Sequence, residues 1–243
     1  MNRDAIKQWI NIYKKDFATR WEKHHYKWEA VQSARSHWNI ESSNLQRCFE
    51  LSAIALNKNR RLLHPFGERM IYGMLQQFLT YETDSIREAL RHLLSDNNRF
   101  SVEERIETYL LEAEEIRERG ANGEHPEWRK HFQTKAGTSA LLWLIYPETF
   151  YYVEPQWLAN ALRELGANYS GNRCRLYYAE ALPFFDIVRE ELNKPEYGLR
   201  DMLQQFLSAQ KHYEDENLSV LTNDFMEYVG RTVQSMKSKL NSL

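Results

Sequence analysis

Cationic and aromatic side chains alternate over residues 9–38, and no other segment of the chain has as much scope for chemistry. Lys and Arg can bind phosphates, and an aromatic ring can stack on a base for about 1–3 kcal/mol. The alternative is that the rings at every fourth position from Trp9 to Trp21 form the core-facing side of a helix, and the spacing favours it. Adjacent helical residues point in different directions, so at least one of Tyr26, Lys27 and Trp28 must face outward or into a groove.

Nucleic acid is the ligand that this pattern fits. The segment 57–67, NKNRRLLHPFG, is predicted to be a basic loop, because Pro65 and Gly67 break a helix. Cations on an exposed loop carry the sequence-independent part of the affinity for nucleic acid. Trp28 is expected to be mostly a core residue. The residues predicted to contact nucleic acid are Lys14, Lys27, Trp28, Arg35, Arg60 and Arg61.

One pair of residues has the spacing of a catalytic centre. Arg20 precedes His25 by four intervening residues, the Arg/His spacing of metal-independent helical ribonucleases of the HEPN type. There a His is the acid/base and an Arg stabilises the developing phosphate charge. The alternative is that His24, His25 and His37 are surface residues of a basic helix. The ribonuclease interpretation requires Arg20 and His25 to converge in a cleft.

Other catalytic and metal-binding patterns are missing from the sequence. It contains no GxxxxGK[ST], GxGxxG or HExxH motif. Seven glutamates crowd the segment 103–118, but a metal site needs inward-facing Glu with partner ligands, and no ExxH is present. A solvated acidic face is the favoured interpretation. We therefore expect no catalytic residue, no metal and no cofactor.

The elements that position these residues are helices. Gly and Pro are scarce, nine and six of 243 residues, and long segments favour helix. Helices are predicted from about 42, 68, 83, 101, 128, 155 and 218, with Ser101 and Glu104 as a capping box and Gly120 as a C-cap. Residues 150–153 are the one strand-like stretch, and Pro183 is expected to interrupt a helix. The predicted fold is mainly α, with at most a minor β element near 150–153.

The loop 121–126 is the predicted hinge. It separates an N-terminal helical subdomain, residues 1–120, from a C-terminal one, residues 127–243, unless the two form one continuous domain. The charged, Ser-rich end suggests that a longer parent chain continues from here.

Charge and cysteine content limit the class of protein. The net charge is −2, but residues 1–65 carry twelve Lys/Arg against six Asp/Glu. This small basic excess is a weak indication that the N-terminal part binds a polyanion. Two cysteines exclude a disulfide framework of the secreted kind, and no signal peptide or membrane-spanning run is present. A reduced, cytoplasmic protein without membrane contact is expected.

Several short motifs stand out along residues 9–153. They are Trp21-x4-Tyr26-Lys-Trp-Glu-Ala-Val31, Trp38-Asn-Ile40, Arg69-Met-Ile71, Glu104-Arg-Ile106, His131-Phe-Gln133, and Leu144-Ile-Tyr-Pro147 with Tyr151-Tyr152. Together they resemble the N-terminal region of McrB-like AAA-family proteins, which are modification-dependent, often 5-methylcytosine-specific, restriction subunits. Asp224-Phe-Met-Glu-Tyr-Val229 is a looser match.

The resemblance implies a recognition module of a restriction and phage-defence system, with modified DNA as the ligand and a motor domain following in the parent chain. The Walker motifs of that motor are absent, so either the sequence stops before them or this is a stand-alone relative. Two alternatives stay open. One is a module that binds only protein, docking an AAA-family motor or nuclease subunit or assembling with itself as a homo-oligomer. The other is the helical ribonuclease.

Overall fold

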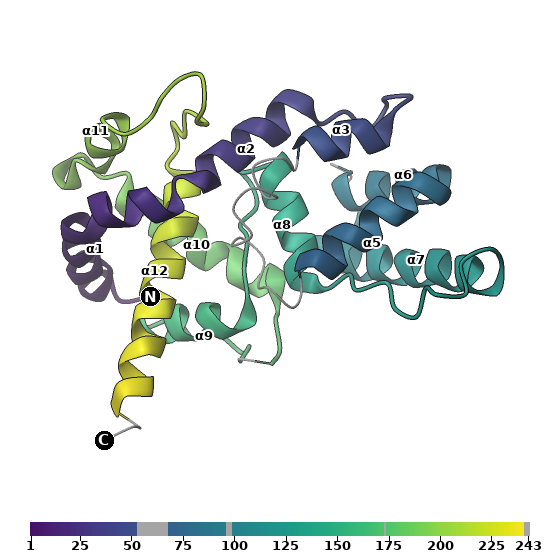
Figure 1. Ribbon diagram of the computed structural model, residues 1–243. Coiled ribbons are helices and arrows are strands. Elements are labelled where there is room, and N and C mark those ends of the chain that lie inside the picture. The colour runs from purple at the N-terminus through teal and green to yellow at the C-terminus, as the bar shows by residue number, and fades with distance from the viewer. Residues whose placement is uncertain (53–67, 96–98, 173, 241–243) are drawn as a thin grey trace. The chain divides into compact units, whose positions relative to one another are not determined.

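The computed structural model describes residues 1–52, 68–95, 99–172 and 174–240 (Figure 1). These residues form eleven α-helices, one 3-10 helix and no strand, so the predicted mainly α fold is confirmed. None of the described helices combines the length and apolar character that a membrane crossing requires.

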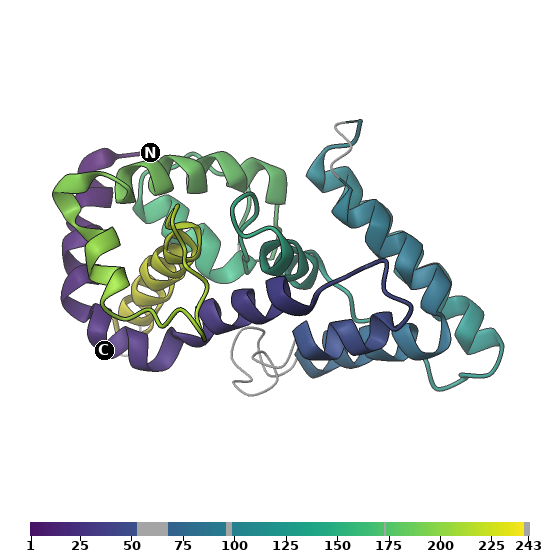
Figure 2. The ribbon, with the colours of Figure 1, turned by 90° about the horizontal axis from the view of Figure 1, so that it is seen from above.

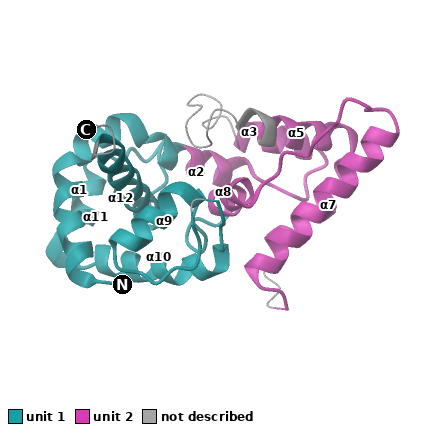
Figure 3. Ribbon diagram, turned by 90° about the horizontal axis from the view of Figure 1, so that it is seen from below, with its two compact units in different colours: residues 1–29, 146–243 teal, residues 30–145 magenta. Residues whose placement is uncertain are grey.

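The chain divides into two compact units, shown in Figure 3. Unit 1 contains Met1–Glu29 and Tyr146–Leu243, and unit 2 contains Ala30–Ile145. The sequence places a boundary at 121–126 instead, but that loop lies inside unit 2. Unit 1 therefore joins the two ends of the chain, which no local sequence signal indicates.

Unit 1 is built around α12, which contacts α1, α9 and α10 (Figure 1 and Figure 2). A Cβ added at Gly230 of α12 would lie 2.1 Å from the carbonyl oxygen of Trp157, so only glycine allows α12 to approach α9 this closely. The helices of unit 1 are α1 (Arg3–His24), α9 (Pro155–Glu164), α10 (Tyr178–Leu192), the 3-10 helix η1 (Pro195–Tyr197), α11 (Leu199–Gln204) and α12 (Ser219–Leu240). α10 continues through Pro183, where an interruption was predicted.

The aromatic stripe of α1 faces the core. Trp9, Tyr13 and Phe17 are buried, together with Ile6 and Ile10, which confirms the core-facing interpretation of these rings. The helix begins at a side-chain cap, because Asn2 accepts hydrogen bonds from the backbone N–H groups of residues 4 and 5. These local features fix where α1 starts and which side it buries.

The predicted strand at 150–153 is wrong. Its residues are buried but form no strand, and two of their backbone groups bond to side chains instead of to a neighbouring strand. The Tyr151 N–H donates to the Tyr178 hydroxyl at 3.1 Å, and the Tyr152 carbonyl accepts from Asn223 at 2.6 Å. The aromatic residues that favour a strand serve here as a buried connection between helices.

The described residues of unit 2 form the rest of α2 (Tyr26–His37), which begins in unit 1, and five further helices. The capping box is confirmed, because Ser101 and Glu104 bond reciprocally at the start of α7. α7 ends three residues later than predicted, at Asn122, since Gly120 lies within the helix where the Trp128 ring covers it. Trp128 itself is not helical. The helices are α3 (Leu45–Ser52), α5 (Glu68–Tyr81), α6 (Thr83–Leu94), α7 (Val102–Asn122) and α8 (Lys135–Ile145).

Candidate functional site

Five ionisable side chains meet inside unit 1, where the junction of α1 and α2 lies against α12. Arg20 and His24 are one turn apart near the end of α1, and Lys27 follows in the first turn of α2. The spacing of three residues puts Asp224 and Glu227 on one face of α12. We refer to these five residues as the ionic cluster.

The ionic cluster is neutralised by its own members. The Arg20 guanidinium binds Asp224 through both carboxylate oxygens, at 2.5 and 2.8 Å. The Lys27 ammonium lies 2.6 Å from an Asp224 oxygen and also contacts Glu227. The Lys27 side chain is 2% exposed and that of Asp224 1%. Two buried cations thus face two buried anions, the arrangement that allows charges to stay ionised away from water.

These neighbours set the pKa values of the acidic members. Burial alone would raise the pKa of Asp224, but the charges of Arg20 and Lys27 hold it well below its ordinary value. Burial opposes the shift at Glu227 too, where Lys27 and Arg20 lower the pKa to about 2. Both carboxylates are therefore ionised over the physiological range.

His24 behaves differently. Burial, followed by the charges of Lys27 and Arg20, lowers the pKa of His24 to about 4, so the ring is neutral at pH 7. Its Nε2 lies 3.5 Å from an Arg20 nitrogen, which fits an unprotonated acceptor. Its buried Nδ1 has no hydrogen-bond partner among the described residues. The neutral ring thus lies at the edge of the charged groups without balancing either sign.

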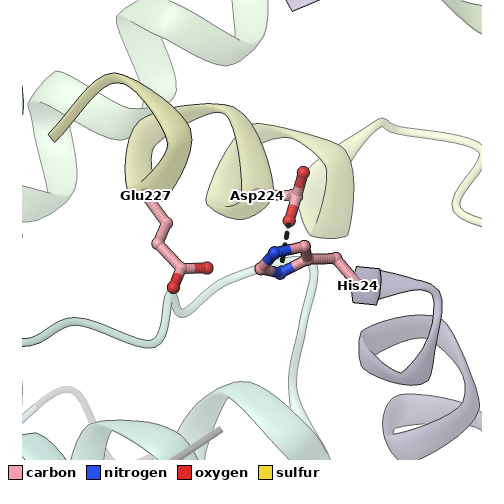
Figure 4. Close-up of side chains that lie close together, drawn as sticks. All are labelled: His24, Asp224 and Glu227. Atoms are coloured by element: carbon pink, nitrogen blue, oxygen red, sulfur yellow. Dashed lines mark ion pairs between the residues drawn. The ribbon is translucent and has the colours of Figure 1, made fainter. Parts of the chain in front are cut away.

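His24, Asp224 and Glu227 point toward one another in Figure 4, and one ligand atom of each lies within 4.8 Å of the others. The donor set resembles a metal site. However, Lys27 already bridges both carboxylates and Arg20 binds Asp224 through two bonds, so a metal ion would have to displace two buried cations. We assign these carboxylates to the ion pairs.

The side chains of Arg20 and His25 point to different partners and do not converge. The Arg20 guanidinium binds Asp224, and its side chain is only 10% exposed. His25 instead places Nδ1 2.9 Å from the Trp21 carbonyl oxygen and Nε2 3.7 Å from Glu29. The histidine that meets Arg20 is His24. A guanidinium paired in this way is not available to stabilise a phosphate.

Two of the six predicted nucleic-acid contacts are buried, and for these the prediction is wrong. Lys27 is 2% exposed inside the ionic cluster, so it cannot reach a phosphate. Trp28 is 1% exposed and donates its indole N–H to Asp215 at 3.0 Å, which confirms the expectation that it is a core residue. Lys14 and Arg35 are exposed, and Lys14 donates to the Tyr197 carbonyl. Arg60 and Arg61 lie outside the described residues.

The sequence interpretation missed Asp224 and Glu227 as partners of Lys27. A signal was present. The two acids stand three residues apart in the first half of α12, among Leu221, Phe225 and Val229. Acidic residues on the buried side of a helix must be paired, so this pattern predicts basic partners elsewhere in the chain.

A second candidate surface is the outward side of α7. The buried side carries Ile106, Tyr109, Ala113 and Ile116, and the opposite side is exposed. Leu111 lies in the middle of that side and is 68% exposed. We define the acidic face as Glu104, Glu107, Leu111, Glu115 and Glu118, all exposed.

The acidic face continues into a hollow at the C-terminal end of α7. The hollow has a volume of about 560 Å³ and is open to solvent. Glu115, Glu118, Arg119, Asn122 and Gly123 line it. Two carboxylates and an amide oxygen therefore surround a space large enough for the end of a long side chain.

Comparison of the chain with protein-family models, with curated proteins and with solved structures finds no match.

Proposed function

We propose that this chain is a protein-docking module, with the acidic face of α7 as its docking surface and the ionic cluster as a structural element. The observation that carries the proposal is the exposure of Leu111 at the centre of four glutamates. Three of these glutamates already have partners within unit 2, because Glu104 accepts from Ser101, Glu107 pairs with Lys135 at 2.8 Å and Glu118 with Arg117 at 3.3 Å. An exposed leucine adds little to folding, and a partner that covers this face would bury it beside Glu115.

The resemblance to McrB-like proteins suggests which partner to test. An AAA-family motor or a nuclease subunit of a restriction and phage-defence system, acting in the cytoplasm, is the partner class that this family implies. In that system the module would recruit or position the subunit that cleaves. The chain itself would contribute binding, since the ionisable side chains of its ionic cluster are committed to one another.

Co-expression with an AAA-family motor or a nuclease subunit of a McrB-like system tests the docking function. We expect the two proteins to elute together in size-exclusion chromatography with light scattering, and Leu111→Ser combined with Glu115→Lys to abolish co-elution. Ile187→Ser with Glu190→Lys is the matched control, because it makes the same kind of change on exposed residues of α10. Co-elution that survives the α7 changes would rule out this surface.

Nucleic-acid binding is the second candidate, and a separate feature favours it. Arg3, Lys7 and Lys14 are exposed, and their spacing of four and seven residues puts them along one edge of α1. Such an edge can follow a phosphate backbone. Modified DNA is the ligand that the family resemblance implies.

Fluorescence anisotropy with duplex, single-stranded and cytosine-methylated DNA tests this candidate. If the edge binds phosphates, Lys7→Ala with Lys14→Ala weakens all duplexes alike and lowers the salt slope by about 2. Arg129→Ala with Lys130→Ala is the control on two exposed cations of unit 2. No binding of any DNA at about 50 mM salt, where phosphate contacts count most, would exclude the nucleic-acid function.

A further inference from the structure

We propose that residues 208–213, between α11 and α12, form a pH-sensitive switch, which protonation of His212 releases from the end of α1 and the start of α2. We refer to this segment as the His212 turn. The inference concerns unit 1 and is independent of the docking function of α7. It rests on the surroundings of the two ring nitrogens of His212, one of which accepts a backbone hydrogen bond.

The His212 turn lies against two tryptophans. The Tyr213 N–H donates to the Trp28 carbonyl oxygen at 3.1 Å. The His212 ring meets the Trp21 ring edge-on, with 5.2 Å between the ring centroids. His212 is only 8% exposed, so the turn covers part of Trp21 with a nearly buried imidazole.

The hydrogen bonds within the turn fix the tautomer of His212. The backbone N–H groups of Lys211 and His212 donate to the Ser208 carbonyl oxygen, both at 2.9 Å, and the Ser208 N–H donates back to Nδ1 of His212 at 2.9 Å. A backbone N–H can only donate, so Nδ1 is unprotonated and the neutral ring carries its hydrogen on Nε2. This Nε2 is buried and has no hydrogen-bond partner in the part of the chain that the structure describes.

A second proton conflicts with this arrangement. A protonated imidazole carries a hydrogen on both nitrogens, so the new hydrogen on Nδ1 would face the Ser208 N–H. The hydrogen bond that closes the turn would be lost, and two donors would point at each other. A ring that has left the turn takes up the proton without this conflict, because water hydrates its charge. Protonation therefore favours the released turn.

The charged groups around the ring do not remove the conflict. The nearest carboxylate oxygen, of Glu29 in α2, lies 3.8 Å from Nε2, which is beyond hydrogen-bond distance. The same oxygen lies 3.7 Å from Nε2 of His25 at the end of α1, so the two rings share one carboxylate. Burial lowers the pKa of His212, His25 and Lys211 add to the lowering, and Glu29 offsets part of it.

Asp215 titrates in a similar range with the opposite sign. Burial raises its pKa to about 6, so the folded state takes up this proton more readily than the unfolded chain does. Its carboxylate accepts from the N–H groups of Val220 and Leu221 in the first turn of α12, at 3.0 and 2.9 Å. We therefore expect the chain from Asp215 onward to stay in place when the His212 turn is released.

The direction with pH follows from these placements. The docked turn is fully favoured above the ordinary histidine pKa of about 6.5. Below it the released form binds the proton more tightly, and its population rises by up to about tenfold per pH unit. Release uncovers more of the half-buried Trp21 ring, so acid exposes an aromatic surface that is covered at neutral pH.

The tautomer of His212 is the first test. Long-range 1H–15N NMR spectra of the full chain at pH 7.5 show which ring nitrogen carries the hydrogen, and we expect it on Nε2. A hydrogen on Nδ1 would overturn the inference, because a proton could then be added at Nε2 beside Glu29 without breaking the turn.

Amide hydrogen exchange measures the release itself. Protection factors, which correct for the intrinsic effect of pH on exchange, are compared at pH 7.5 and 5.5. We expect the amides of Ser208, His212 and Tyr213 to lose protection by up to about tenfold at the lower pH. The amides of Val220 and Leu221, which donate to Asp215, are the internal control and should keep theirs.

Two variants assign the effect to the ring. His212→Asn keeps an acceptor for the Ser208 N–H but cannot be protonated, so protection of the turn should no longer fall between the two pH values. His37→Asn makes the same change on an exposed residue of α2 and should keep the wild-type loss. Unchanged protection in the wild type, or an equal loss in His212→Asn, would overturn the inference. An equal loss at Val220 and Leu221 in the wild type would show general unfolding instead of local release, and overturns it without either variant.

Discussion

Replacing Lys27 with Met is expected to destabilise the protein by up to about 3–5 kcal/mol, because it removes one cation from a buried network of ion pairs. Met is close to Lys in length but carries no charge, so packing changes little. Asp224 keeps its bonds to Arg20, and Glu227 keeps Arg231 at 2.5 Å and Arg20 at 3.5 Å, but both carboxylates lose the ammonium that they share. Urea unfolding followed by circular dichroism gives the free energy of unfolding.

Two further variants separate a charge effect from a packing effect. Lys23→Met makes the same change on an exposed residue of α1, four positions earlier, and should stay within about 0.5 kcal/mol of the wild type. Adding Glu227→Gln to Lys27→Met removes the buried carboxylate that has lost its ammonium, and Arg231 keeps Glu154, so the double variant should be more stable than Lys27→Met alone. If Lys27→Met and Lys23→Met were equally stable, the Lys27 ammonium would not be buried among the carboxylates.

The features that the sequence predicts correctly are local ones. The core-facing rings of α1 follow from a spacing of four residues, and the capping box at Ser101 and Glu104 follows from chemistry within one helical turn. The solvated acidic face on α7 is predicted correctly in part: of its seven glutamates, Glu104, Glu107, Glu115 and Glu118 are exposed, whereas Glu103, Glu112 and Glu114 are half-buried. The exposure of Leu111 is not predictable in the same way, because a leucine in a helix usually faces the core.

The features that the sequence does not predict depend on distant contacts. Lys27 and Asp224 are 197 residues apart, and their pairing requires the two ends of the chain to form one unit. The sequence predicts that Trp28 is mostly a core residue, but it does not predict the hydrogen-bond partner Asp215, which is 187 residues away. The segment 150–153 has the composition of a strand and becomes a buried connection because helices, not strands, surround it. In each case tertiary contacts override a local preference.

Lowering the pH is expected to destabilise the protein in two stages, one below pH 6.5 and one below the ordinary pKa range of carboxylates. Protonation of His24 accounts for part of the first stage. Its pKa is about 4 in the folded state against 6.5 for an ordinary histidine. The unfolded chain therefore binds the proton more tightly. The stability that the neutral ring provides is complete above pH 6.5 and is lost as the pH falls toward 4. A pKa shift of this size corresponds to about 3 kcal/mol of the free energy of unfolding, once the pH is below both pKa values.

The carboxylates follow at lower pH. Glu227, with its pKa lowered to about 2, stabilises the fold above pH 4.5 and loses that contribution as the pH falls toward 2. Asp224 has a lowered pKa as well, so it acts in the same direction below the ordinary range of an aspartate. The interval from pH 6.5 to 4.5 is therefore the one in which His24 can be observed without the two acids.

His24→Gln removes the titrating ring and keeps a polar side chain beside Arg20. We expect the free energy of unfolding of this variant to fall less than that of the wild type between pH 6.5 and 4.5, by up to about 2 kcal/mol. All other ionisable groups are the same in the two proteins, so the difference between the two curves isolates His24. His37→Gln, the same change on an exposed residue of α2, is the matched control. If the free energies of unfolding of His24→Gln and the wild type ran parallel with pH, His24 would bind its proton equally well in the folded and unfolded chains. Its position beside Arg20 and Lys27 would then not disfavour the charged ring.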